Sequence, residues 1–170
     1  MTKPTYLLIA AVTIDGKIAR QEKPGTSWTS PEDKAFLHKK LDSCDCLVVG
    51  HTTYQTATNK LAQRNCIVFT HSTSGGNRHE RCRYLNPQRV NLDAFVRSRG
   101  YRTVGVLGGI SVFNYFLQRN LIDDLYLTIE PLVFGDGLPL ADARITNRSY
   151  RLRSVRRLNA SGTLLIHYQK

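Results

Sequence analysis

The chain has 170 residues, of which 41% are hydrophobic, and 24 Lys and Arg residues against 13 Asp and Glu residues give it a formal net charge of +11. This length and composition exclude a low-complexity chain and predict a single domain over residues 1–170. No apolar run is long enough to cross a bilayer, and the first residues lack the apolar core of a signal peptide, so we expect a cytoplasmic protein without a membrane partner.

The cysteines raise the possibility of a zinc site, and the clustered arginines raise that of nucleic-acid binding. The four cysteines match no zinc-ligand spacing, and cytosolic thiols stay reduced, so we interpret them as buried or half-buried small residues. The arginine cluster is compatible with nucleic-acid binding, but aromatic residues do not alternate with it as a stacking platform requires. We favour the solvated face of a hairpin and keep nucleic-acid binding as a weaker alternative. The cluster comprises Arg144, Arg148, Arg151, Arg153, Arg156 and Arg157.

The first quarter of the chain predicts a strand, a loop and a helix. Tyr6–Val12 is apolar on both faces, which is typical of a central strand. Residues 20–30 have the composition of a loop, and Trp28 within them predicts a lid over the core. A capping serine, a proline and two acids predict a helix over residues 30–43. Asp33 shares a face with the apolar residues of that helix, so it is either a partner of the helix dipole or a catalytic carboxylate.

Two further strands end in glycine or polar residues. The carboxyl ends of parallel strands lie at one edge of a sheet, and a helix N-terminus favours an anion. Polar strand ends therefore predict a nucleotide crevice, with ordinary loop capping as the alternative. The residues concerned are Gly50, His51, Thr52 and Thr53 after one strand, and Thr70, His71 and Ser72 after the other.

The stretch Thr103–Phe113 predicts a buried strand, a glycine turn and the start of a helix. Apolar residues recur at helical spacing within 110–119, so one face of this helix packs on a sheet. Gly108 and Gly109 have no Cβ, so a phosphate could approach the first backbone N–H groups of the helix closely. A tight connection without a ligand is the alternative for a bare pair of glycines.

The last third of the chain predicts a long strand and a terminal hairpin. Leu125–Phe134 is apolar, with Thr128 at its centre as either a core residue or a ligand contact, and it could be an edge open to pairing in a homodimer. Residues 151–158 and 163–169 predict a hairpin. Together the elements predict an α/β fold with a mixed, mostly parallel sheet, helices on both faces and an antiparallel C-terminal hairpin.

With these elements placed, residues 6–139 resemble the dihydrofolate-reductase-like superfamily, and within it the reductase domain of bacterial riboflavin biosynthesis. Residues 13–19, 27–32, 108–109 and 121–137 look like the riboflavin reductase pattern. Trp28, Pro31, Asp33 and Thr128 also match dihydrofolate reductase itself. The resemblance implies the three-layer dihydrofolate-reductase-like fold.

The resemblance also implies an activity. It implies an NADPH-dependent oxidoreductase that transfers a hydride to a C=N bond of a small heterocycle. The leading substrate is a phosphoribosylated aminopyrimidine, as in 5-amino-6-(5-phosphoribosylamino)uracil reductase. Dihydrofolate or another pterin is the alternative. Leu107 stands where riboflavin reductases commonly have an acid, and Phe113 replaces a tyrosine common in dihydrofolate reductases.

The same resemblance assigns roles to individual residues. Asp33 and Thr128 would be catalytic, and Lys17, Trp28 and Arg64 would bind the substrate. The residues implied for the cofactor are Ala11, Ile18, Gly50, His51, Thr52, Thr53, Thr70, His71, Ser72, Gly108, Gly109, Ile110, Ser111 and Val112.

Overall fold

The structure is a computed structural model that describes residues 3–20, 25–71, 77–79, 81–142 and 144–170. In this part of the chain nine strands form one sheet, in the order β10-β11-β8-β1-β7-β3-β4-β6-β5, and β2 pairs with β9 beside it. The strands are β1 Thr5–Thr13, β2 Lys17–Ala19, β3 Cys46–Gly50, β4 Cys66–Phe69, β5 Asn77–His79, β6 Cys82–Leu85, β7 Thr103–Val106, β8 Asp124–Glu130, β9 Leu138–Pro139, β10 Arg151–Arg157 and β11 Leu164–Gln169.

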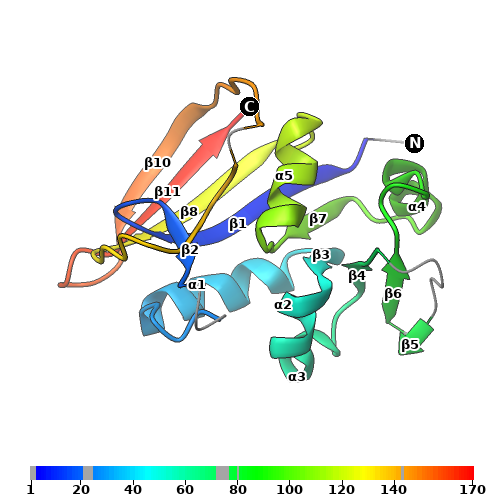
Figure 1. Ribbon diagram of the computed structural model, residues 1–170, viewed down its shortest axis with the longest axis horizontal. Coiled ribbons are helices and arrows are strands. Elements are labelled where there is room, and N and C mark those ends of the chain that lie inside the picture. The colour runs from blue at the N-terminus through cyan, green and yellow to red at the C-terminus, as the bar shows by residue number, and fades with distance from the viewer. Residues whose placement is uncertain (1–2, 21–24, 72–76, 80, 143) are drawn as a thin grey trace.

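Helices cover both faces of the large sheet (Figure 1). Leu41, Tyr54 and Leu61 bring α1, α2 and α3 into one buried cluster with alternate residues of β1 and β3. Val96 and Phe116 bring α4 and α5 into a second cluster on the opposite face. This is the three-layer arrangement that apolar residues on both faces of the central strands require. The helices are α1 Pro31–Asp42, α2 His51–Thr56, α3 Thr58–Leu61, α4 Leu92–Ser98 and α5 Ile110–Gln118.

The six strands β8, β1, β7, β3, β4 and β6 run parallel to one another. Their carboxyl ends therefore meet at one edge of the sheet. The connection through α1 leaves β1 in one direction along the sheet, and the connection through α5 leaves β7 in the other. Ligands of open α/β sheets bind at the carboxyl edge, where connections diverge in this way.

The expected strand Leu125–Phe134 is shorter than predicted, and it is not an edge. β8 ends at Glu130, and the next residue, Pro131, has no N–H group to donate to a ladder. β8 lies inside the sheet, paired with β1 on one side and β11 on the other. The prediction that this strand is open to pairing with a second copy is therefore wrong.

The C-terminal hairpin is confirmed, and its outer strand is rich in arginine. β10 pairs antiparallel with β11 and forms one edge of the sheet. All seven of its residues are exposed, including four arginines. The cysteines also match expectation, because Cys46, Cys66 and Cys82 are buried thiols and Cys44 is half-buried. Among the described helices, none has the length and apolarity to cross a membrane.

Candidate active site

The N-terminus of α1 places Asp33 at the carboxyl edge of the sheet. Ser30 is the N-cap, and its hydroxyl oxygen accepts the Asp33 backbone N–H at 3.2 Å. Pro31 occupies the first helical position, where its missing N–H costs nothing. The Asp33 side chain turns inward toward β8, with only 5% of the residue exposed. An acid that caps a helix dipole has no need of such burial, which favours the catalytic interpretation.

The Asp33 carboxyl group lies in a small polar cluster enclosed by protein. The hydroxyl groups of Thr128 on β8 and Thr29 before α1 hydrogen-bond it, and both threonines are buried. Burial raises the pKa of Asp33 above its usual value, the two hydroxyl groups oppose that change, and the charge of Glu130 adds to it. The cluster can therefore hydrogen-bond a polar ligand edge and hold or release a proton.

Ala11 belongs to the same cluster by register. β1 and β8 pair in parallel with Ala11 opposite Thr128, so both side chains point to the face that α1 covers. The structure thus brings together Asp33, Thr128 and Ala11, which lie 22 to 117 positions apart in the chain.

The glycine turn after β7 forms a second part of the same edge. The Gly108–Gly109 peptide bond is cis, and the Gly50 N–H donates to the Gly108 carbonyl at 2.8 Å. Gly109 is the N-cap of α5, and a Cβ placed on it would lie 3.7 Å from Thr53 Oγ1. The ends of β3 and β7 therefore meet directly.

The first turn of α5 fits an anionic group. The first N–H groups of a helix have no intrahelical acceptor, so those of Ile110 and Ser111 are available to a ligand. The N–H of Val112 already donates to the Gly109 carbonyl at 3.0 Å, and its side chain is fully buried. The Val112 side chain therefore packs beneath the turn.

The remaining residues expected at the cofactor lie along neighbouring strand ends. His51, Thr52 and Thr53 form the first turn of the short helix α2, with the His51 ring edge-on to Tyr84. Thr70 follows β4, and the exposed His71 comes next. Ser72 lies outside the described residues.

The segment with Trp28 packs on the loop that follows β8. The half-buried Trp28 ring contacts the Phe134 ring edge-on, with 5.1 Å between centroids. The Arg20 guanidinium lies over the Phe134 ring, 4.4 Å from its centroid. Asp15 holds this loop in place, because its carboxylate accepts the N–H groups of Phe134 and Gly135 at 3.1 and 2.8 Å. The arrangement has the form of the expected cover over the strand ends.

Lys17 and Ile18 lie in β2, beside this cover. The Lys17 N–H donates to the hydroxyl oxygen of Thr13, the last residue of β1, at 2.9 Å. Ile18 is half-buried and packs on the core cluster of α5. Both residues are therefore held close to the carboxyl end of β1.

The structure does not bring Arg64 to this edge. Arg64 forms an ion pair with Asp42 at the C-terminal end of α1, and its guanidinium donates to the Lys60 carbonyl at 2.8 Å. It precedes β4, which begins at Cys66, so it lies at the amino end of the parallel strands. A role for Arg64 in substrate binding has no support in this position.

Two residues of the cluster were missed by the sequence analysis. Thr29 is an ordinary loop residue by sequence, and only the fold shows that it is buried against Asp33. Glu130 ends the apolar run of β8 and is 3% exposed. An acid at the end of a mostly apolar strand is a signal that could have identified it.

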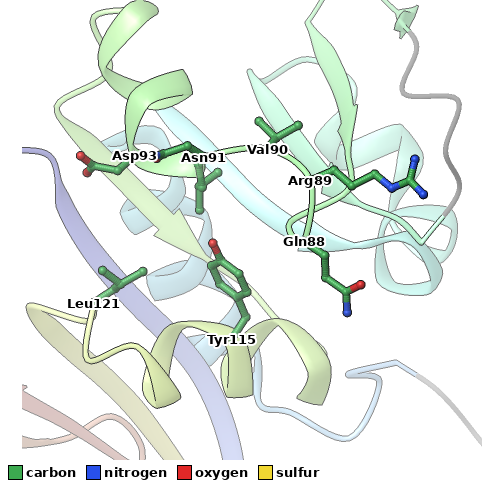
Figure 2. A pocket seen from close by; sticks show the side chains of 8 residues that line it. Gln88, Arg89, Val90, Asn91, Asp93, Tyr115 and Leu121 are labelled. Atoms are coloured by element: carbon green, nitrogen blue, oxygen red, sulfur yellow. The ribbon is translucent and has the colours of Figure 1, made fainter.

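Two hollows lie near these elements. One of about 490 Å³ is an open hollow bordered by the N-terminus of α1, the end of β8 and the turn between β10 and β11, with Glu130, Asn159 and Thr163 in its wall. Another, of about 420 Å³, lies between α5 and the segment that leads into α4. Figure 2 shows the Tyr115 side chain projecting from α5 toward that segment. The first hollow adjoins the Asp33 cluster.

Comparison with known proteins supplies the family. Residues 55–162 match the model of the RibD C-terminal domain. The chain belongs to the RibD C-terminal domain family. The protein YwjB of Bacillus subtilis strain 168, which is described as uncharacterized, is 24% identical to it over 99% of this chain and 98% of its own length.

Solved structures show the same fold. A pyrimidine reductase-like protein from Corynebacterium diphtheriae matches with a TM-score of 0.77 and 16% identity, over 98% of this chain and 91% of that one. A diaminohydroxyphosphoribosylaminopyrimidine deaminase/5-amino-6-(5-phosphoribosylamino)uracil reductase from Thermotoga maritima matches with a TM-score of 0.73 and 17% identity, over 98% of this chain and 56% of that one. The dihydrofolate-reductase-like fold is thus confirmed.

Proposed function

We propose that this protein is an NADPH-dependent reductase that transfers a hydride to the C=N bond of a phosphoribosylated aminopyrimidine. The observation that carries the proposal is the buried Asp33–Thr128 pair at the carboxyl edge of the sheet. The glycine turn lies at the same edge. Membership of the RibD C-terminal domain family supports a reductase and a nicotinamide cofactor. The choices of NADPH and of the substrate are part of the proposal.

The residues of the glycine turn fit the diphosphate of a dinucleotide. Gly109 has no side chain in front of the N-terminus of α5, and its neighbour Thr53 presents a hydroxyl group to the same space. Backbone N–H groups of Ile110 and Ser111 would bind the diphosphate, and His51, Thr52, Thr70 and His71 would line the adenosine end. When bound, the reduced nicotinamide supplies the hydride.

The Asp33 cluster would orient the heterocycle and serve its nitrogen. A carboxyl group hydrogen-bonded by Thr128 and Thr29 can pair with the amino and ring nitrogens of an aminopyrimidine edge. The reduction adds a hydride to carbon and a proton to nitrogen, and Asp33 would transfer that proton and be left as a carboxylate. Trp28, packed on Phe134, would exclude water from the reacting atoms. Lys17 would contact the ribose or phosphate of the substrate.

A pterin reductase is the second candidate. Trp28, Asp33 and Thr128 support it as well, and Leu107 precedes the glycine pair as in dihydrofolate reductase. The resemblance to dihydrofolate reductase also implies that Arg64 contacts the glutamate tail of folate, but Arg64 lies at the opposite edge of the sheet. The aminopyrimidine proposal therefore stays ahead.

The test is a paired assay of the two substrates. We expect NADPH oxidation with the phosphoribosylaminopyrimidine, little with dihydrofolate, and a loss of about 10²-fold or more in the Asp33→Asn variant. Lys60→Ala is the matched control, because Lys60 lies on α3 beside Arg64, away from the carboxyl edge of the sheet. This variant should keep the wild-type rate. Turnover of dihydrofolate alone would favour the pterin reductase, and no turnover of either substrate would contradict both proposals.

A further inference from the structure

Glu130 is a buried acid to which the proposed chemistry assigns no part. It ends β8 with 3% of its surface exposed. One carboxylate oxygen accepts the backbone N–H of Ser30 at 2.7 Å, and the other accepts the Thr163 hydroxyl group at 2.6 Å. Both bonds are donated to Glu130, which is the pattern of an ionised carboxylate. A buried charge is costly unless it is held in this way, so its presence calls for a physical explanation.

We propose that Glu130 is a positioning residue for Asp33, which fixes the start of α1 against the end of β8 and places a second negative charge beside the Asp33 carboxyl group. The inference rests on the proposed function, because it concerns the same acid.

The positioning part follows from an unbroken chain of hydrogen bonds. Glu130 holds the Ser30 N–H, and the Ser30 hydroxyl oxygen accepts the Asp33 N–H. Ser30 is thus fixed on both sides, which sets the angle at which α1 leaves the loop. Thr128 and Glu130 both belong to β8. The bond between Ser30 and Glu130 therefore also sets the position of Asp33 relative to Thr128.

The C-terminal hairpin supports this arrangement from the other side. Thr163, which donates to Glu130, accepts a hydrogen bond from the Asn159 side-chain amide at 2.9 Å. The same amide group donates to the Glu32 carboxylate at 3.1 Å. The hairpin turn therefore contacts α1 directly through Glu32 and indirectly through Glu130.

The electrostatic part concerns the pH at which Asp33 loses its proton. Burial is the main cause of the raised pKa of Asp33, and the Glu130 charge from β8 adds to it. The neighbouring cation Lys34, on α1 itself, acts in the opposite direction, as do the Thr128 and Thr29 hydroxyl groups. Glu32 is also close along the helix, but its carboxylate is exposed and engaged by Asn159. Without the Glu130 charge, Asp33 would lose its proton at a lower pH.

The experiment compares Glu130→Gln with Asn159→Ala in the full chain. Glutamine keeps the shape and the bond from Ser30 but removes the charge, whereas Asn159→Ala weakens the hairpin brace and leaves both carboxylates in place. The first readout is the titration of the Asp33 carboxyl group by carbon-13 NMR, without substrate or cofactor. We expect its midpoint to move to lower pH in Glu130→Gln and to stay at the wild-type value in Asn159→Ala.

The second readout is the pH profile of turnover. The rate of Glu130→Gln relative to wild type should be close to one at acidic pH and should fall as the pH rises, because the proton on Asp33 is lost earlier. An unchanged Asp33 titration in Glu130→Gln, with a loss of stability equal to that of Asn159→Ala, would mean a structural role only and would overturn the inference.

Two further controls keep the outcomes separate. If Glu130→Gln does not fold, the double variant Glu130→Leu/Thr163→Val removes the charge together with its buried hydroxyl partner, and it is subject to the same titration. If the wild type does not reduce the aminopyrimidine, the proposed function fails, while the NMR titration still decides whether Glu130 controls Asp33.

Discussion

At the scale of single residues, the proposed chemistry depends on the buried carboxyl group of Asp33. Asp33 has both the burial and the hydroxyl partners expected of a group that binds and protonates a ligand. The same burial is unfavourable for the folded chain, since the ionised form loses water that two hydroxyl groups replace only in part. Active sites often hold such destabilised groups, and substitution then raises stability while activity is lost.

The first prediction is that Asp33→Asn stabilises the protein in a pH-dependent way. Because the pKa of Asp33 is raised in the folded state, the folded chain holds this proton more tightly than the unfolded chain. Wild-type stability therefore falls as the pH rises from the unfolded pKa to the folded pKa, and asparagine does not titrate. Urea unfolding at several pH values should show the variant to be more stable at neutral pH, with the difference shrinking toward acidic pH. A difference independent of pH would contradict the assignment.

At the scale of elements, the two glycines between β7 and α5 have different tasks. Gly108 has a φ of +89°, and a Cβ on it would lie 2.6 Å from the buried ring of Phe113. Gly109 has an ordinary negative φ, and its would-be Cβ makes only a normal contact at 3.7 Å. Gly108 is thus required by the turn, whereas Gly109 leaves space in front of the helix.

The second prediction separates these tasks by alanine substitution. Gly108→Ala should lower the free energy of unfolding by about 1–3 kcal/mol, because both the backbone conformation and the Phe113 contact oppose a Cβ. Gly109→Ala should change stability by about 0.5 kcal/mol or less but weaken NADPH binding about tenfold or more, since its methyl group faces the diphosphate. Urea unfolding and titration of NADPH fluorescence measure the two effects. Equal NADPH affinity of Gly109→Ala and wild type would place the diphosphate elsewhere.

At the scale of the whole molecule, the parallel strands collect the site at one edge and leave the basic hairpin at another. β10 lies at the far side of β11 and β8, and its arginines are exposed. Arg153 is held by the Gln169 side chain, and Arg157 by backbone carbonyl groups of the hairpin turn. Such arginines are partly engaged by the hairpin itself, which agrees with a solvated face more than with a nucleic-acid surface.

The third prediction concerns the stability of the whole fold. NADPH at 100 times its Kd should stabilise the folded chain by about 2.7 kcal/mol, because the strand ends that form its site exist only in the folded state. Thermal unfolding should show a higher Tm with NADPH and a smaller increase with NADH. A single-stranded oligonucleotide should produce no comparable rise at 150 mM salt. Stabilisation by the oligonucleotide alone would support the nucleic-acid alternative.

Local patterns were enough to predict the architecture. Apolar strands, glycine turns and helix caps are short-range signals, so the α/β class, the hairpin and the starts of α1 and α5 followed from the order of residues. The end of β8 was placed too late, because Val133 and Phe134 continue the apolar pattern although the chain has left the ladder after Pro131. Apolar character alone does not separate a strand from an apolar loop.

The sequence by itself determined the fold class, the glycine turn and the candidate carboxylate, because each depends on residues within about one turn or one strand of each other. Only the tertiary structure decided which distant residues share the site. It brought Thr29 and Glu130 to Asp33, whose pairing with Thr128 the family resemblance already implied, and it placed Arg64 at the opposite edge. The physical reason is that strand order and register set these distances, and both depend on the packing of the whole sheet.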